Sequence, residues 1–430
     1  MRGKKVLAAA LSAVVLGASV GAMAACGDGK GNEMVYWCFD ADMAQQVKDY
    51  YISKQDLGYK IKIETMTLDN MLSKLDNGLR TGKNLPDVVA LEGASFKRYI
   101  DGKILENLDA LKPLTADMYD YTVEAASKDG HLYALATNVT PGVFAYRRSI
   151  ARETFGTDDP AEIQAKFNNW ENFLESAREL KAKNYKVLSS YMDIAKVYFG
   201  GRTTGWVDEQ NNLVIDESLT KDENGLMETA KLLKDENLSN ETAENTAAWF
   251  TDISGKQVFG YFQATWGIRS NLERNCTSAT SQETSYGDWA ICEGPSNFFE
   301  GGTFHAVIKG TKWKTEAKEF VKFFSTDETY LTDWAKENGD FMNSKSCMQA
   351  IADDAEYQNE FLGGQNPYSI YISAASHING KIITQYDSTI NGQFKAWATN
   401  YAEAITQNKS DCITEFKNSI KGIYTTITVK

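Results

Sequence analysis

Acidic side chains directly follow two segments that the sequence predicts to be buried strands. Asp40 and Asp42 come after the apolar run at residues 34–39, and Glu92 comes after residues 86–91. In an open α/β sheet, groups just beyond the carboxyl ends of the strands face the crevice that holds a ligand. Carboxylates form strong, charge-assisted hydrogen bonds, so they suit a ligand with many hydroxyl groups. For Asp40 and Asp42 the alternatives are a solvated position or the cap of a helix.

Aromatic side chains near predicted strand ends add a second kind of contact. A flat ring can pack on the C–H face of a sugar, whereas a buried polar group left without its hydroxyl partner is penalised and so gives specificity. Trp266 ends a predicted strand and is the first such candidate. The further candidates are Trp37, Asn138, Trp206, Phe304 and Asp340. For Trp266, Trp37 and Phe304 the alternative is packing in the hydrophobic core.

The sequence carries no recognisable motif for metal binding or catalysis. There is no Cys-x-x-Cys pair, and residues 208–212 offer oxygen ligands without the spacing of a calcium loop. The three histidines, His131, His305 and His377, are far apart, and no zinc-protease, nucleophile-elbow or phosphate-binding motif occurs. We therefore expect no metal, no cofactor and no catalytic residue. Because a glycosidase needs only two carboxylates, an extracellular glycan-degrading enzyme stays an alternative.

Length and charge limit the classes of protein to which the chain can belong. At 430 residues it exceeds what one hydrophobic core usually supports, so two lobes are expected. The 43% of apolar residues suits a packed globular protein. The net charge is −13, with 45 basic against 58 acidic residues and no basic cluster. Since nucleic-acid binders present basic stripes that replace phosphate counterions, that class is excluded.

The first 26 residues have the pattern of an export signal. Basic residues precede a short apolar stretch at residues 6–20, and small residues then lead to Cys26. This end resembles a bacterial lipobox, in which the cysteine is lipidated and becomes the new N-terminus, with Met23 in place of the usual leucine. We expect residues 1–25 to be removed and Cys26 to carry a two-chain anchor, with residues 26–33 as a tether. The alternative is plain secretion.

Five cysteines remain after Cys26: Cys38, Cys276, Cys292, Cys347 and Cys412. Because five is an odd number, at least one of them is unpaired even in an oxidising compartment. In one interpretation Cys276 and Cys292 form a disulfide, and in the other all five are free thiols.

The order of apolar runs and helical patterns predicts an α/β fold. Residues 34–39 and 86–91 are predicted buried strands, residues 59–65 alternate as a half-buried strand, and helical spacing separates these segments. Such an order predicts a mainly parallel sheet covered by helices. Pro141-Gly142 then separates two apolar runs, the first of which is predicted to be one buried strand that includes Leu132, Ala134 and Leu135. We interpret the pair as the point where the chain enters a second lobe, the alternative being a turn inside one domain.

The second half of the chain repeats this pattern with different residues. A helical region opens at Asp159-Pro160 and can split at Asn168-Asn169. Further strands are predicted at residues 187–188, 257–262 and 288–292. Residues 303–308 predict a strand that returns to the first lobe, and an amphipathic helix follows it. From about Ser344 onward, helices are expected to return to the second lobe.

Taken together, these segments resemble the extracellular carbohydrate-binding proteins of ATP-binding-cassette importers, the class that includes maltose-binding protein. Short motifs in the family's order carry the resemblance: Leu85-Pro-Asp-Val-Val89 with Gly102-Lys-Ile-Leu105, Gly130-His-Leu-Tyr133 with Ala145-Tyr146, Trp170-Glu-Asn-Phe173, Gly260-Tyr-Phe-Gln-Ala-Thr-Trp266, and Gly301-Gly302 with Ala317-x-x-Phe320. Trp266 matches the family's cleft tryptophan. Two positions depart from the pattern, because Arg147 stands where asparagine is usual and Ala264 replaces an inner glycine.

The resemblance implies an α/β fold of two discontinuous lobes joined by a multi-strand hinge, as in type II periplasmic binding proteins. Lobe 1 would comprise residues 34–140 with 303–343, and lobe 2 residues 143–301 with 344–430. It also implies an oligosaccharide in the cleft and docking onto the transmembrane subunits of an ABC permease. The protein would be a monomer anchored by lipid at the outer face of the cytoplasmic membrane of a Gram-positive bacterium. The alternatives are the same fold with a non-sugar solute and a structural lipoprotein.

Overall fold

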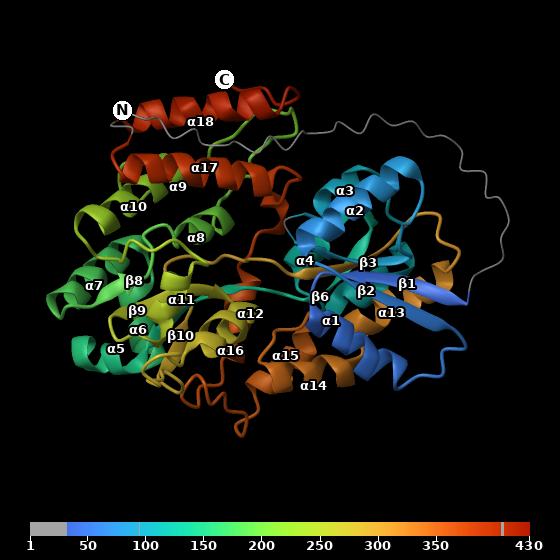
Figure 1. The fold of residues 1–430 in the computed structure, drawn as a ribbon, viewed down its shortest axis with the longest axis horizontal. Helices are drawn as coiled ribbons and strands as arrows, with labels where there is room; N and C mark the ends of the chain where they lie inside the picture. Colours follow the sequence, from blue (N-terminus) through green and yellow to red (C-terminus); the bar gives the residue numbers. More distant parts are fainter. Residues whose placement is uncertain (1–31, 94, 406–407) are drawn as a thin grey trace.

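The structure, a computed structural model, describes residues 32–93, 95–405 and 408–430. The predicted signal peptide and Cys26, where lipidation is predicted, lie outside the described residues. The described elements build two sheets, of five and four strands, with helices around each (Figure 1). We refer to the part built on the five-stranded sheet as the first lobe and the part built on the four-stranded sheet as the second lobe.

The first sheet forms from the short apolar runs that predict strands. Its order is β2-β1-β3-β11-β6. The strands are β1 (Glu33–Cys38), β2 (Lys60–Thr65), β3 (Val88–Glu92), β6 (Ala134–Asn138) and β11 (Thr303–Val307). β1 is parallel to β2 and β3, and β11 is antiparallel to β3 and β6. β6 therefore runs in the same direction as β1 and β3, and the carboxyl ends of these three strands meet at one edge of the sheet.

Each helix of the first lobe buries part of its surface. They are α1 (Ala41–Gln46) with η1 (Val47–Ile52), α2 (Leu68–Thr81), α3 (Lys97–Asp101), η2 (Asp109–Asp117), α4 (Asp120–Ala125), α13 (Lys314–Thr326) and α14 (Glu328–Asn338). α14 ends at Gly339, which has a φ of 65° in the left-handed region. A small ribbon of β4 (Ser127–Lys128) and β5 (His131–Leu132) precedes β6. The prediction of one strand through Leu132 and Leu135 is therefore wrong, because the Tyr133 amide donates to the Ala126 carbonyl instead.

The second sheet has the order β10-β7-β9-β8. Its strands are β7 (Gly142–Arg147), β8 (Lys186–Leu188), β9 (Val258–Ala264) and β10 (Trp289–Cys292). All seven residues of β9 are buried, which explains why this central strand is continuously apolar or small apart from Gln263. Asn168 ends one helix and the Asn169 side chain caps the next by accepting from the Asn172 amide at 2.8 Å. The predicted split of this helical region is confirmed.

The helices of the second lobe come from two separate stretches of the chain. The first stretch supplies α5 (Arg148–Phe155), α6 (Pro160–Phe167), α7 (Trp170–Ala182), α8 (Ala195–Gly200), α9 (Glu217–Thr220), α10 (Leu226–Asp235), α11 (Ala247–Ser254), α12 (Thr265–Gly267), η3 (Ile268–Leu272) and η4 (Glu273–Asn275). The second stretch supplies α16 (Tyr368–Ser376), η5 (Gly380–Ile382), α17 (Asp387–Ala402) and α18 (Lys409–Ile423). In Figure 1 the red α17 and α18 lie beside the green α9 and α10, far from the orange α13 and α14.

Three segments of the chain cross between the lobes side by side. β6 runs directly into β7 through residues 139–141, with Pro141 paired to Phe299 on one side and Asn138 paired to Met342 on the other. At Gly142 an added Cβ atom would lie 2.1 Å from the Phe298 ring, so no larger residue fits there without a shift. The chain therefore leaves the first sheet at Pro141-Gly142 as predicted, and the multi-strand hinge is confirmed.

The third crossing is gradual. α15 (Lys345–Ala352) still packs against α14, and α16 packs against both α15 and β7. The Ser344 hydroxyl donates to the carboxylate of Asp117 in the first lobe at 2.5 Å. The chain thus passes back to the second lobe over residues 345–368 rather than at a single turn.

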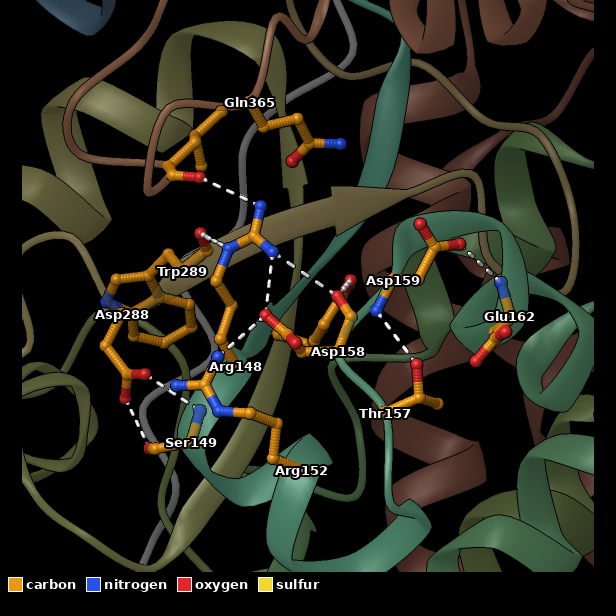
Figure 2. Close-up of polar contacts among 12 residues, drawn as sticks. Arg148, Ser149, Arg152, Thr157, Asp158, Asp159, Glu162, Asp288, Trp289 and Gln365 are labelled. Carbon is orange, nitrogen blue, oxygen red and sulfur yellow. Dashed lines mark hydrogen bonds and ion pairs between the residues drawn. The ribbon is translucent and has the colours of Figure 1, made fainter.

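Arg147 occupies the position where the family pattern has asparagine. Its Nε donates to the Asp288 carboxylate at 2.8 Å and its Nη1 donates to the Gly255 carbonyl at 2.7 Å. The neighbouring Arg148 donates to the Asp158 carboxylate and to the Trp289 carbonyl at 2.9 and 3.0 Å (Figure 2). Both arginines are thus used inside the second lobe, where they join β7, β10 and the start of α5, and neither contributes a free cation to a ligand site.

Within the described residues, the five cysteines Cys38, Cys276, Cys292, Cys347 and Cys412 are all free and all buried. The interpretation with a Cys276–Cys292 disulfide is therefore wrong, and the alternative of five free thiols holds. In the same residues, no helix has both the length and the apolar character that crossing a bilayer requires. Nor do they contain a group of three or more acidic, histidine or cysteine side chains arranged to bind a metal ion.

Candidate ligand-binding site

A cavity of about 550 Å³ lies at the edge of the first sheet where the carboxyl ends of β1, β3 and β6 meet. The first lobe lines it with residues that follow β1 and α14 and with the ends of β3 and β6. The second lobe lines it with residues of α12, η3 and η4, and the crossing segment at residues 300–302 closes one side. Binding pockets for small molecules enclose about 300 to 1,000 Å³. The cavity therefore has the size and the two-sided walls of a ligand site.

Six of the nine candidate ligand-binding residues line this cavity. They are Asp40, Asp42, Glu92, Asn138, Trp266 and Asp340. The first four follow or end parallel-running strands of the first sheet, so one rule about strand ends brings them together. Asp40 also caps α1, since its carboxylate accepts from the Asp42 amide at 2.6 Å. The capping role does not exclude a ligand role, because a carboxylate has further lone pairs to offer.

The other three candidates lie in the hydrophobic core, away from the cavity lining. Trp37 is 2% exposed and has the ammonium of Lys74 at 4.2 Å from its ring centre. Phe304 stacks on Phe96 with ring centres 4.1 Å apart. Trp206 is completely buried. Successive side chains of a strand point to opposite faces, and large aromatic rings commonly fill the core. A position near a strand end was therefore not enough to place these rings at the cavity.

Trp206 shows why an aromatic ring in a polar loop is ambiguous in sequence. Its indole Nε1 donates to the Asn391 side chain at 2.7 Å, and its ring packs against Phe394 and Phe416. These partners lie in α17 and α18, at the far end of the chain. The ring therefore fixes the last two helices onto the second lobe, and the prediction of a ligand contact is replaced by a packing role.

Asp340 is held at the inner wall of the cavity by three donors. The Phe341 amide donates to it at 2.9 Å, the Trp334 indole at 3.3 Å and the Asn138 amide group at 3.4 Å. Burial raises the pKa of Asp340, although these hydrogen bonds and the nearby Arg269 oppose the rise. The side-chain oxygen Oδ1 of Asn138 accepts from the Thr303 amide at 2.9 Å, which ties β6 to β11 at the same point. Both candidates are thus preorganised rather than free to rotate.

His305 lies at the base of the cavity and was not expected there. Its two ring nitrogens form hydrogen bonds of 2.8 Å with the Tyr36 hydroxyl and of 2.8 Å with the Thr137 hydroxyl. Burial lowers the pKa of His305 from 6.5 to about 3. The imidazole is therefore neutral at physiological pH, and it supports the floor of the site rather than adding charge to it.

The buried His305 predicts a specific dependence of stability on pH. The folded protein binds no proton at His305 above about pH 3, whereas the unfolded chain protonates it below its ordinary pKa of 6.5, so folding loses stability as the pH falls. The expected loss from this group between about pH 7.5 and pH 5 is about 2 kcal/mol. We expect His305→Gln to lack this loss when its urea denaturation is compared with that of the wild type at both pH values.

A second buried group makes that comparison between variants necessary. Burial, and then the Glu244 carboxylate, raise the pKa of Asp193 to about 7. A carboxylate with a raised pKa has the opposite effect on stability. The folded protein takes up a proton below pH 7 that the unfolded chain does not yet bind, so this group stabilises the fold as the pH falls. An equal pH dependence in the wild type and in His305→Gln would contradict the assignment of a neutral buried His305.

Trp266 lies on the second-lobe side of the cavity, at the end of β9. Its side chain is 37% exposed, and its Nε1 donates to the Glu300 carbonyl at 2.9 Å. An added Cβ atom on Gly301 would lie 3.3 Å from the same indole nitrogen. Gly301 has a φ of 84°, a value that favours glycine. The residue 300–301 backbone thus fixes the indole edge, and part of the ring remains free to contact a ligand.

Two arginines of the second lobe reach across the cavity to the first lobe. Arg269 Nη1 donates to the Asn338 side chain at 2.6 Å. Arg269 and Arg274 each approach the Asp42 carboxylate at 3.9 Å, with all three side chains at least 41% exposed. A short charged hydrogen bond between the lobes favours their approach, whereas the long exposed ion pairs contribute little.

Removal of the Arg269 guanidinium is expected to open the ligand-free protein. Arg269→Gln should raise the radius of gyration measured by small-angle scattering without ligand, and should weaken ligand binding by about three- to tenfold, because fewer molecules are then poised for closure. Arg274→Gln is the matched control, since it removes an equally long Asp42 contact and leaves the Arg269–Asn338 bond in place. Identical scattering of the two variants and the wild type would refute a role for this bond in lobe approach.

The charges around the cavity are mostly negative. Five acidic residues line it, Asp40, Asp42, Glu92, Glu300 and Asp340, against Arg269 and Arg274. The carboxylate of Glu300 is paired with Lys196, which lies outside the lining, so the other four carboxylates face the cavity without that ion pair. This balance disfavours an anionic ligand, because like charges in a partly desolvated site repel each other strongly. A neutral ligand with many hydroxyl groups can use the same carboxylates as hydrogen-bond acceptors.

Several lining residues escaped the sequence analysis, although one local signal was available. Arg269 and Ser270 follow Trp266 at positions i+3 and i+4, so a helical turn after the β9 strand puts them on the same side as the indole. Trp334 and Asn338 come from the end of α14, and Glu300 comes from a loop. Nothing local in the sequence marks these three, because their position depends on how the two lobes meet.

Comparison with known proteins places the chain among bacterial binding proteins. A profile of the family described as bacterial extracellular solute-binding protein matches residues 45–362. An arabinooligosaccharide-binding protein of Halalkalibacterium halodurans is 24% identical over 195 residues, which are 43% of this chain and 42% of that protein. One of Bacillus subtilis is 24% identical over 221 residues, which are 50% of this chain and 48% of that protein. The chain thus matches a little less than half the length of these curated relatives.

Solved structures share the fold over nearly the whole chain. The galacto-N-biose/lacto-N-biose I-binding protein of an ABC transporter from Bifidobacterium longum, in complex with lacto-N-biose, has a TM-score of 0.70 at 16% identity, covering 94% of this chain and 100% of that one. The sugar-binding protein MalE from Xanthomonas citri has a TM-score of 0.71 at 14% identity, covering 91% of this chain and 97% of that one. Likeness at this identity shows the fold alone, and it confirms the two-lobe fold expected from the resemblance.

Proposed function

Because the chain belongs to the bacterial extracellular solute-binding proteins, we propose that it captures an oligosaccharide between its lobes and delivers it to the permease of an ABC importer. The observation that carries this proposal is the cavity of about 550 Å³ lined from both lobes, with Trp266 on one wall and carboxylates on the other. A site divided between two lobes binds its ligand fully only when the lobes approach, so ligand binding favours the closed form.

We assign the six lining candidates two kinds of contact. Trp266 packs its exposed ring on the C–H face of a sugar ring. Asp40, Asp42, Glu92, Asn138 and Asp340 bind hydroxyl groups, and a ligand that lacks one of these hydroxyls loses the corresponding hydrogen bond. Both kinds of contact are needed, because stacking alone tolerates many flat ligands while hydrogen bonds select among them.

The proposed ligand is an uncharged oligosaccharide. The excess of carboxylates around the cavity supports a ligand without negative charge. The names of the Bacillus subtilis and Halalkalibacterium halodurans relatives support a pentose oligomer as the first ligand to test. Disaccharide binding in the Bifidobacterium longum structure of the same fold supports a hexose oligomer as the second.

The proposed setting is the outer face of the cytoplasmic membrane of a Gram-positive bacterium. Cys26 carries the lipid anchor, residues 26–33 act as the tether, and the mature protein works as a monomer. We propose lobe boundaries at residues 34–140 with 303–343 and 143–301 with 344–430, where residues 345–368 form the gradual crossing that still packs on α14 of the first lobe. In the closed form the two lobes together offer one surface to the transmembrane subunits of the permease.

A thermal-shift screen followed by calorimetry tests the proposal. The panel holds arabinotriose, β-1,6-galactobiose, lacto-N-biose and maltotetraose, with galacturonate trimer as the anionic control. A ligand at about a hundred times its Kd should stabilise the protein by about 2.7 kcal/mol, whereas the anionic trimer should give no shift. Stabilisation by none of the neutral sugars would overturn the sugar proposal. New reducing ends after prolonged incubation with the sugars would instead favour the glycan-degrading enzyme.

A further inference from the structure

Behind the second-lobe wall of the cavity lies a lysine that no contact with a ligand would explain. Lys196 belongs to α8, and only 14% of its side chain is exposed. Its ammonium donates to the Glu300 carboxylate at 2.9 Å and forms a second ion pair with Glu244. A largely buried ammonium is costly unless it is paired, so the position of Lys196 is tied to these two carboxylates.

Glu300 connects this lysine to the proposed stacking ring. Its side chain is the partner of Lys196, and its backbone carbonyl accepts from the Trp266 indole at 2.9 Å. Its amide donates to the Thr140 carbonyl at 3.2 Å, in the neighbouring crossing segment. One residue therefore joins the buried lysine, the tryptophan and the hinge.

The charges around Lys196 show what its ammonium does. Asp193, Glu244 and Glu300 face it, and Lys395 adds one further ammonium, 3.2 Å from Glu244. Burial acts against the charged form of Lys196, but these carboxylates outweigh it and raise its pKa. Without Lys196, the Glu300 carboxylate would lose its ion pair and would be free to turn toward the cavity, which already holds four other carboxylates.

We propose that Lys196 is a positioning residue of the ligand site, which holds the Glu300 side chain out of the cavity and thereby fixes the carbonyl that orients Trp266. The effect on sugar affinity rests on the proposed function, whereas the effect on the Trp266 environment does not. Glu300 is the intermediary, so Lys196 acts on the ligand through it.

The first test is a double-mutant cycle that measures the affinity for arabinotriose. If arabinotriose does not bind, the sugar of the panel that binds best is used instead. Lys196→Met, of similar length and without charge, should weaken binding about tenfold, and Lys196→Arg should restore most of it. Lys395→Met is the matched control, because Lys395 forms an ion pair with Glu244 in the same cluster, whereas among the described residues the ion pair with Glu300 belongs to Lys196, and the variant should bind as the wild type does. In a Glu300→Ala background, Lys196→Met should cause no further loss, since the intermediary is already gone.

The second test needs no ligand. In protein labelled with 5-fluorotryptophan, nine fluorine resonances are expected from the nine tryptophans, and the one missing in Trp266→Phe belongs to Trp266. This resonance should shift in Lys196→Met and in Glu300→Ala and stay in place in Lys395→Met. If Lys196→Met does not fold, the test is made with Glu300→Ala alone. The Glu300 side chain is 38% exposed, so its removal disturbs the core less than removal of the buried lysine.

The outcomes separate the two proposals. A Trp266 resonance that moves in Lys196→Met, together with no binding of any sugar by the wild type, would support the positioning role and overturn the proposed function. Sugar binding by the wild type with unchanged affinity and an unchanged Trp266 resonance in Lys196→Met would overturn the positioning role. Losses that simply add in the double mutant would show that Lys196 does not act through Glu300, which also overturns it.

Discussion

Replacement of Trp266 by alanine is expected to weaken sugar binding by about 30- to 150-fold while the protein stays folded. Packing an aromatic ring against a sugar face removes apolar surface from water on both partners, and such a contact contributes about 2 to 3 kcal/mol. The ring is already 37% exposed without ligand, so its removal creates little unfilled space in the core. Calorimetric titration measures the affinity, and thermal denaturation without ligand measures the stability.

Tyr286→Ala is the matched control for this loss. Tyr286 is 45% exposed in the second lobe and does not line the cavity, so its removal should leave affinity unchanged. Unchanged affinity in Trp266→Ala would remove Trp266 from the site and with it the main aromatic contact. Lost affinity together with a large fall in melting temperature would instead mean that the ring supports the fold.

The opposite result is expected for Trp206, another tryptophan that the sequence predicts as a ligand contact. Trp206→Ala should lower the free energy of unfolding by about 3 to 5 kcal/mol, because it leaves a large cavity among Phe394, Phe416 and the neighbouring helices. It also leaves the Asn391 side chain without the indole donor. Urea denaturation followed by circular dichroism measures the loss. Sugar affinity at low temperature, where the variant is still folded, should stay within about twofold of the wild type.

Trp206→Phe serves as the control for volume. It keeps part of the packing and loses the hydrogen bond to Asn391, so its destabilisation should be clearly smaller than that of Trp206→Ala. A variant of Trp206 that unfolds normally but binds sugar much more weakly would restore the ligand role that the structure replaces with packing.

These two tryptophans show how far the sequence could predict the site. The rule that polar groups beyond parallel strand ends face a ligand placed Asp40 and Glu92 at the cavity, because it depends only on strand order and direction. Trp206 could not be separated from Trp266 in the same way. Its partners Asn391, Phe394 and Phe416 in α17 and α18 are 185 to 210 residues away along the chain, and no local pattern reports such a contact.

The fold was more predictable than the site for a related reason. Strands and helices follow from periodicity and from caps such as Asn169, which are local, and the crossing at Pro141-Gly142 follows from backbone chemistry. The contacts across the cavity do not. The Arg269–Asn338 hydrogen bond joins segments that meet only after both lobes have formed. The Lys196–Glu300 ion pair, behind the cavity wall, joins residues 104 positions apart in the sequence.

Because the five described thiols are buried only in the folded state, folding of this extracellular protein competes with oxidation of its thiols. Burial raises the pKa of Cys38 and Cys292, so in the folded molecule these sulfurs stay protonated and out of reach of oxidants. A chain that emerges unfolded outside the cell exposes all of them at once, and wrong bridges within or between molecules would then block collapse. Once the protein is folded, its thiols are protected from oxidation only as long as it rarely unfolds. Its working lifetime should therefore follow the rate of opening rather than the equilibrium stability, and its recovery after heating should depend on added reductant.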